Sequence, residues 1–222
     1  MLTRALLYER SADLPPEPNA PDAALERPES LLDVFDRLAS TQTEGMTLGA
    51  LMQALGDRAV AAALFALALP CCIPFLYIVP QLVALPMAFF ALQMALGRRG
   101  LWLPETFAKR LIPHKSLEDI AKGGRRFFGW VEAIVKPRFT AITGPLSERV
   151  VGVFLVVFCA SVLTPLPATN TVPGFAVALT AFGLMERDGL LVIGGVALGA
   201  LWVTALLAAF LFGLGFLTSV IA

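Results

Sequence analysis

The 222-residue chain carries no net charge, and it is 57% hydrophobic but only 15% charged. Soluble domains are about 45–50% apolar and about 25% charged, so this composition speaks against a soluble fold. The charges are also clustered, because 59–97, 150–185 and 189–222 contain no Asp, Glu, Lys, Arg or His. Uncharged apolar runs longer than about 18 residues are typical of membrane-spanning segments. The chain therefore reads as an integral membrane protein.

The first segment, residues 1–29, is predicted to be a disordered tail. It is rich in Pro, Ala and acidic residues, a composition that buries little apolar surface. Its one apolar stretch is short and is interrupted by Arg4, Glu9 and Arg10, so it lacks the pattern of a signal peptide.

Residues 30–58 are predicted to form amphipathic helices in the headgroup layer. Ser30 can cap a short helix whose apolar residues fall on one face. Thr47 is the expected N-cap of a second helix, which can continue past Arg58 into the bilayer.

The first uncharged block, 59–97, is too long for one membrane crossing. As a single helix it would measure about 58 Å, against a hydrocarbon core of about 30 Å. We therefore expect it to fold back as a hairpin. The positions where it can break are the prolines Pro70, Pro74, Pro80 and Pro86.

The connecting segment 98–149 is basic, with 11 Lys or Arg against 5 Asp or Glu. Basic loops beside spans stay in the cytoplasm, so we place this segment there, with anionic lipid headgroups rather than nucleic acid as its partner. One short helix is expected after Pro104. A second is expected from His114, with Gly123–Gly124 as a point where it can divide. Whether this second helix lies in the interface or packs on the protein in the cytoplasm stays open.

The next segment, 150–188, repeats the design of the first uncharged block. Two apolar legs, 150–163 and 174–185, flank a Pro-rich breaker at 164–173. Each leg covers only about 18–21 Å as a helix. The legs are therefore either re-entrant half-helices that meet inside the membrane or two short tilted spans.

The two hairpins also resemble each other in sequence. Residues 86–103 can be aligned without gaps to 175–192, and 73–80 to 164–173 with a two-residue offset. We interpret this as an internal duplication. Matched Pro-interrupted segments in such repeats point to a binding site near the bilayer midplane. Because no convincing span separates the hairpins, a parallel pair is favoured, but an inverted pair stays open.

The last segment, 189–222, is long enough for a C-terminal transmembrane helix. Gly195 and Gly199 are four residues apart, a spacing that allows close contact between helices. A homodimer formed through this face is one candidate assembly. In total, the sequence predicts an all-α polytopic membrane protein: two Pro-broken helical hairpins form an internal repeat, joined by a C-terminal span and interfacial amphipathic helices.

The chemistry that the membrane blocks can supply is neutral. Without an ionisable acid or base, neither a proton relay nor catalysis is expected, so the protein is predicted not to be an enzyme. The three cysteines read as small buried apolar residues, and no metal or cofactor is expected. The remaining candidates for binding a substrate are Thr164, Thr169, Asn170, Thr171, Tyr77, Gln81 and Gln93.

Asn170 has two interpretations. It can cap the helix that follows it, or it can line a cavity and contact a polar solute or a lipid headgroup. Arg98 and Arg187 end the two hairpins in similar turns, "GRRG" and "ERDG". They are candidates for gating or headgroup binding, and the alternative is a solvated turn with local ion pairs.

Several stretches together resemble the exopolysaccharide synthesis ExoD family. They include "TLGALMQALGDR" (47–58), "LPMAFFALQMALGRRGLWLP" (85–104), "PLPATNTVPGFAVAL" (165–179) and "GLMERDGLLV" (183–192). The resemblance covers roughly 30–215. The chain departs from the family pattern in the first breaker, where Cys71 stands at the position of an expected Asn.

The resemblance implies a multi-pass protein of the bacterial inner membrane that is linked to exopolysaccharide production. It supplies no reaction. We expect a transporter-like scaffold that translocates a lipid or solute. The alternative is a non-transporting accessory protein that assembles with the polysaccharide synthesis and export machinery.

Overall fold

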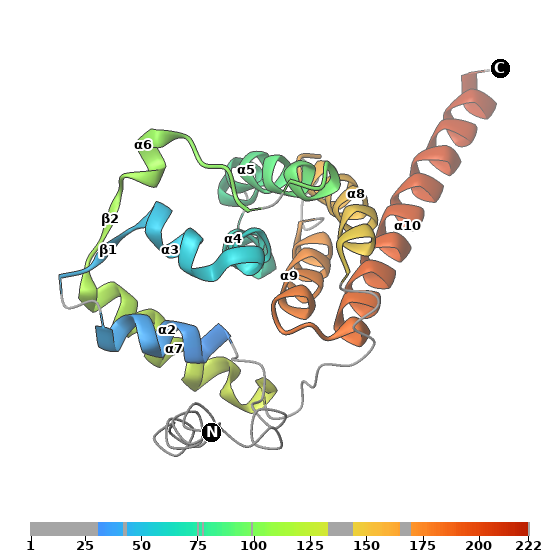
Figure 1. Cartoon of the computed structure of the whole chain (residues 1–222). Coiled ribbons are helices and arrows are strands. Elements are labelled where there is room, and N and C mark those ends of the chain that lie inside the picture. Colours follow the sequence, from blue (N-terminus) through green and yellow to red (C-terminus); the bar gives the residue numbers. More distant parts are fainter. Residues whose placement is uncertain are drawn as a thin grey trace, which may run out of the picture.

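The structure, a computed structural model, describes residues 31–41, 44–74, 76, 78–98, 100–132, 144–164 and 170–221. Its core is four central helices, with a long C-terminal helix beside them and an amphipathic pair at one side (Figure 1). The predicted helical class is confirmed, with one small exception. Met46–Thr47 (β1) and Leu111–Ile112 (β2) pair as a two-residue antiparallel ladder. This ladder ties the start of the membrane region to the connecting segment.

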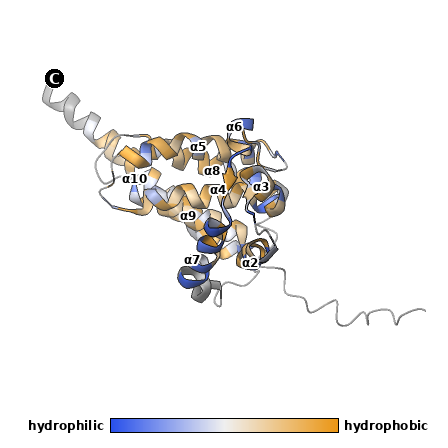
Figure 2. Cartoon of the chain, turned by 90° about the vertical axis from the view of Figure 1, so that its left-hand side faces the viewer, coloured by the Kyte–Doolittle hydropathy of each residue, from blue (hydrophilic) through white to orange (hydrophobic). Residues whose placement is uncertain are grey.

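The amphipathic pair consists of α2 (Leu31–Thr41) and α7 (His114–Glu132), which lie side by side (Figure 1). Arg125 of α7 joins them, because its guanidinium donates to Asp33 (2.9 Å) and to Asp36 of α2. α7 runs without interruption through Gly123–Gly124, where the sequence allowed a division. Figure 2 shows blue, hydrophilic residues on α7 and α6 (Glu105–Ala108), in contrast to the orange central helices.

The first candidate span covers the 25 residues Leu48–Cys72 and is interrupted at Gly56, whose backbone angles (φ 55°, ψ −128°) are not helical. It consists of α3 (Leu48–Leu55), a 3-10 turn η1 (Gly56–Arg58), α4 (Ala59–Ala68) and a 3-10 turn η2 (Leu69–Cys72). Thr47 caps its start as predicted, since its hydroxyl oxygen accepts from the Ala50 N–H at 3.2 Å.

In the first block, α4 ends at Ala68, just before Pro70 in η2, and Pro74 stands between η2 and α5 (Ile78–Ala95). Pro80 and Pro86, in contrast, lie inside α5. Pro80 is tolerated because it stands in the first helical turn, where a backbone N–H would have no acceptor in the helix. Only the first two of the four predicted break points therefore act as breaks.

In the second block, α8 (Pro145–Val162) ends before the breaker, and α9 (Thr171–Met185) begins inside it, three residues earlier than the predicted second leg. α10 (Gly189–Ile221) follows after a short turn, and its C-terminal part projects away from the other helices (Figure 1). In the part of the chain that the structure describes, three segments are long and apolar enough to cross a membrane: Leu48–Cys72, Ile78–Ala95 and Gly189–Gly213. Thr171–Met185 is a shorter apolar helix.

The four central helices form a closed ring, in which α4 packs on α5, α5 on α8, α8 on α9, and α9 on α4. Small residues allow the closest approaches. A Cβ atom on Gly174 of α9 would lie 2.6 Å from the Cβ of Cys71 in η2. Gly195 and Gly199 of α10 face Thr180 of α9 and Phe158 of α8. The glycine face of α10 is thus used within the chain, and a homodimer, which stays a prediction, needs another face.

Candidate functional site

The neutral polar residues predicted as a site come from the two helix breaks and from α5. Tyr77 and Thr169 lie outside the described residues. Thr164 is exposed just after α8, and its N–H donates to the carbonyl oxygen of Ser161 at 3.2 Å. Thr171 is the first residue of α9 and is half-buried. The structure thus gathers Asn170 and Thr171 at the N-terminal end of one helix.

Asn170 is the residue whose position is most unusual. Its side chain is buried, with the residue 6% exposed, and its Oδ1 atom has no hydrogen-bond partner among the described residues. It stands at the N-cap position of α9, yet it makes no side-chain capping hydrogen bond. The capping interpretation is therefore wrong. A buried amide oxygen without a partner costs about 1–3 kcal/mol, so its retention needs another explanation.

The lost cap has a local cause. An N-cap side chain accepts from the backbone N–H of the second or third helical residue. The third residue of α9 is Pro173, which has no N–H. Asn170 itself has helical backbone angles (φ −81°, ψ −24°) instead of the extended angles that aim a cap side chain at the first turn. Asn170 and Pro173 are both visible in the sequence, so this outcome was open to prediction.

Gln81 and Gln93 of α5 have different environments. Gln81 lies in the first turn, and its Oε1 atom is buried without a partner among the described residues. Gln93, near the C-terminal end of α5, is 3% exposed, and both polar atoms of its side-chain amide form hydrogen bonds. Its Nε2 donates to the carbonyl oxygen of Trp102 (3.2 Å), and the Trp102 N–H donates to its Oε1 (2.9 Å). Gln93 therefore anchors the chain that leaves α5, whereas Gln81 shares the unpaired state of Asn170.

Several charged residues lie at the other ends of these helices, away from the two helix breaks. Burial raises the pKa of the Glu148 carboxyl, the nearby charge of Asp57 raises it further, and Arg187 opposes the shift. The Arg149 side chain lies directly against Gly97, at the end of α5. The two hairpin ends, at Gly97 and Arg187, therefore both lie near the first turn of α8. Arg98 and Arg187 are exposed there.

The turn that ends the second hairpin, between α9 and α10, is not simply exposed to solvent. Asp188 is 5% exposed, and its Oδ1 accepts from the Leu190 N–H at 2.9 Å, at the start of α10. An acidic side chain at this position stabilises a helix N-terminus. Sequence reasoning assigned Asp188 to a solvated turn and missed this role. The signal was present, because Asp188 stands just before the last apolar run.

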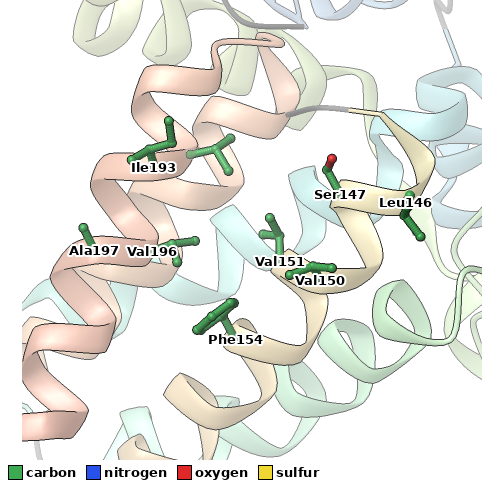
Figure 3. Close-up of a pocket in the computed structure, with 9 residues that line it drawn as sticks. Leu146, Ser147, Val150, Val151, Phe154, Ile193, Val196 and Ala197 are labelled. Atoms are coloured by element: carbon green, nitrogen blue, oxygen red, sulfur yellow. The ribbon is translucent and has the colours of Figure 1, made fainter. Parts of the chain in front are cut away.

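Two apolar cavities border the helices. A groove of about 420 Å³ between α8 and α10 is open on one side, and Ser147 contributes its only polar side chain (Figure 3). A second cavity of about 510 Å³ separates the α2–α7 pair from α3, α4 and α9. Both can hold hydrocarbon. Among the described residues, no group of three or more His, Cys, Asp or Glu is arranged to hold a metal ion.

The apolar ring, and the three candidate membrane spans among the described residues, are features of a helical membrane protein. The family model "Exopolysaccharide synthesis, ExoD" matches residues 31–208. The chain therefore belongs to the ExoD family, as its sequence motifs indicated.

Two relatives are similar to this chain. "Protein ExoD" of Rhizobium meliloti strain 1021 is 29% identical over 163 residues, which cover 71% of this chain and 68% of that protein. "Uncharacterized protein slr1875" of Synechocystis sp. strain PCC 6803 is 33% identical over 112 residues, or 50% of this chain. That match spans about half of the Synechocystis protein, 53%. No solved structure matches the chain.

Proposed function

We propose that this protein is a transporter-like scaffold of a bacterial inner membrane, which translocates a lipid or solute in support of exopolysaccharide production. The link to exopolysaccharide synthesis comes from the family to which the chain belongs. Translocation is supported mainly by one observation. Gln81 in the first turn of α5 and Asn170 at the start of α9 each have a buried amide oxygen with no hydrogen-bond partner among the described residues.

A repeat relationship between the two hairpins supports the proposal. α5 begins with Ile78-Val79-Pro80 and α9 with Thr171-Val172-Pro173. Both helices also end in the same hydrogen-bond pattern. The Arg98 N–H donates to the carbonyl of Gln93 (3.1 Å), and the Asp188 N–H donates to that of Gly183 (2.8 Å). Each bond spans five residues and closes a Schellman motif around a residue with positive φ, Gly97 or Arg187.

The first legs correspond as well. Asp57-Arg58 precedes α4, and Glu148-Arg149 stands in the first turn of α8. In each helix, a row of buried residues begins three positions after the acidic residue. Three buried positions then follow in each helix at equal spacing: Val60, Leu64 and Ala68 in α4, and Val151, Leu155 and Cys159 in α8. This register differs slightly from the gapless alignment of the sequences, since α5 is three residues longer than α9.

The ring of helices favours a parallel repeat. Asp57 and Glu148 are equivalent under this register, and they are close enough to interact electrostatically. Equivalent ends therefore lie on one side of the ring, which agrees with a pseudo-twofold axis along the helices. We propose that this charged end faces the cytoplasm, together with 98–149, because that segment is basic. The two breaks then form the opposite end, as re-entrant tips within the membrane.

We propose no enzymatic activity, and the expected partners are membrane lipids and the polysaccharide machinery. Apolar lining and neutral amides suit binding and passage better than bond-breaking, which needs acids, bases or nucleophiles placed together. A non-transporting accessory role is the competing hypothesis. It predicts that the tips stay dry in every state.

Cysteine accessibility tests the proposal. In a background with Cys71, Cys72 and Cys159 replaced by Ala, Asn170→Cys and Thr171→Cys are treated with a membrane-impermeant thiol reagent. We expect both to be labelled, since a translocation site must be reached by water in at least one state. Phe175→Cys, on the 51%-exposed outer face of α9, is the unlabelled lipid-facing control. Glu105→Cys in exposed α6 is the labelled control in inside-out vesicles, because the proposal places 98–149 in the cytoplasm. Protection of both tip positions under all conditions would rule out a wet translocation site.

A further inference from the structure

The N-terminal end of α9 offers hydrogen-bond donors. The first backbone N–H groups of an α-helix have no acceptor within the helix. The Gly174 N–H is already bonded to the carbonyl oxygen of Asn170 at 3.0 Å, and Pro173 has no N–H. The N–H groups of Thr171 and Val172 are the other donors of this helical end, and no acceptor for them is found among the described residues.

The same end offers an acceptor. Asn170 Oδ1 is buried and has no partner in the described part of the chain. Pro173 lacks one of the two N–H groups that usually bond an N-cap side chain, and Asn170 makes no capping hydrogen bond, so this oxygen is not used by the helix. Donors and an acceptor thus belong to consecutive residues at this end of α9.

We propose that this end of α9 binds a hydroxyl group of a sugar or another polyol, either free or carried by a lipid. A hydroxyl is both donor and acceptor, so it can donate to Asn170 Oδ1 and accept from a first-turn N–H in the same pose. The inference rests on the proposed function for the location of the site, and it adds the class of ligand.

A neutral ligand fits better than an anion. A helix N-terminus alone favours negative charge. Here, however, the free acceptor Oδ1 would repel an anionic oxygen, and the segment 150–185 contains no Lys or Arg to compensate for a buried negative charge. Cys71, which packs on Gly174 in the next turn, adds an apolar wall instead of a cation. The hydroxyl of a sugar needs no such compensation.

The test measures which lipids the full-length protein retains, by native mass spectrometry from detergent. The probes are glucosyl diacylglycerol, which is neutral and rich in hydroxyls, and phosphatidic acid, which is anionic and has no hydroxylated headgroup. We expect preferential retention of the glucosyl lipid. Asn170→Leu, similar in volume but without the acceptor, is expected to weaken that retention about threefold to tenfold, the loss of one hydrogen bond. Retention of phosphatidic acid is expected to stay unchanged.

Thr204→Ala is the matched control, since the Thr204 hydroxyl donates to the Ala200 carbonyl of its own helix at 2.8 Å. Competition by free glucose identifies a soluble sugar as the ligand, and its absence identifies a lipid-borne sugar. The inference is overturned if Asn170→Leu retains the glucosyl lipid as the wild type does, or if phosphatidic acid is the lipid that depends on Asn170. If the glucosyl lipid is retained but Asn170→Cys is not labelled, the hydroxyl-binding site is supported and translocation is rejected. If Asn170→Cys is labelled but no preference for the glucosyl lipid is seen, translocation is supported and the hydroxyl-binding site is rejected.

Discussion

Gly152 of α8 and Ala95 of α5 lie so close together that a Cβ atom on Gly152 would stand 2.5 Å from the backbone nitrogen of Ala95. Because backbone cannot move aside as a flexible side chain can, Gly152→Val must separate the two helices. We expect a loss of about 1–3 kcal/mol or more in the free energy of unfolding, the usual cost of overpacking. Thermal unfolding in detergent measures the loss as a lower midpoint.

Gly123→Ala is the control for this substitution. Gly123 also lies inside a helix, α7, but its added Cβ would meet no atom within 4 Å. Alanine favours helix over glycine by about 0.5–1 kcal/mol, so this variant is expected to be as stable as the wild type or more stable. Equal destabilisation by both changes would show that the α5–α8 contact does not limit stability.

Asn170→Leu is expected to stabilise the protein. The change removes a buried oxygen without a partner at nearly constant volume, and such a group costs about 1–3 kcal/mol. A structural cap would give the opposite sign, a loss of about 0.5–2 kcal/mol. The midpoint of thermal unfolding separates the two. A rise in stability together with loss of sugar retention is the signature of a residue kept for function.

Gln93→Leu provides the contrast. The Gln93 amide is bonded at both ends to the backbone of Trp102, so its removal leaves the Trp102 N–H and carbonyl without these partners. We expect destabilisation by about 1–3 kcal/mol. If Asn170→Leu and Gln93→Leu shifted stability in the same direction, the difference in their environments would carry no energetic weight.

Glu148→Gln is expected to stabilise the protein at neutral pH. Burial is the main cause of the raised pKa of Glu148, so the folded state binds its proton more tightly than the unfolded state does. Stability therefore falls as pH rises from the ordinary value of 4.5 through the raised value, and the loss persists above it. The neutral amide of the variant does not titrate and does not lose this stability. Unfolding followed between pH 4 and 8 should show that the variant is more stable than the wild type at high pH and equally stable at low pH.

Glu118→Gln is the control with the opposite sign. The hydrogen bond from Lys122, at 2.8 Å, lowers the pKa of the Glu118 carboxyl. This carboxylate therefore contributes stability above its unfolded pKa, and that contribution is lost as pH falls through the folded value. The variant should be slightly less stable than the wild type at neutral pH, by an amount that salt reduces. The same sign for both variants would argue against burial as the cause at Glu148.

The sequence predicted the helices well because hydrophobic runs, charges and prolines are local signals. Thr47 as a cap and Pro70 and Pro74 as breaks needed no tertiary information. Pro86 was ambiguous, because the packing of α5 on α8 decides whether a proline interrupts a helix or is accommodated in it.

The site was only partly predictable for a similar reason. Composition pointed to Asn170, but only burial and the lack of a partner distinguish it from Gln93, which is equally polar and equally deep in an apolar block. The interaction between Asp57 and Glu148 joins residues 91 positions apart, and local pattern says nothing about such a pair. That pair is what favours a parallel orientation of the repeats.

Arg187→Gly separates the conformational role of the second hairpin turn from a role for its charge. Arg187 has φ of 55°, whereas the equivalent turn of the first hairpin has glycine at φ 69°, Gly97. A left-handed residue with a side chain costs about 1–2 kcal/mol, so the glycine variant is expected to be more stable by up to about 1 kcal/mol. Gly97→Ala should be strongly destabilised, because it adds strain and meets the Arg149 side chain. If Arg187→Gly is stable but loses glycolipid retention or export, the guanidinium acts on headgroups or in gating. Full activity would instead show that Arg187 serves the turn alone.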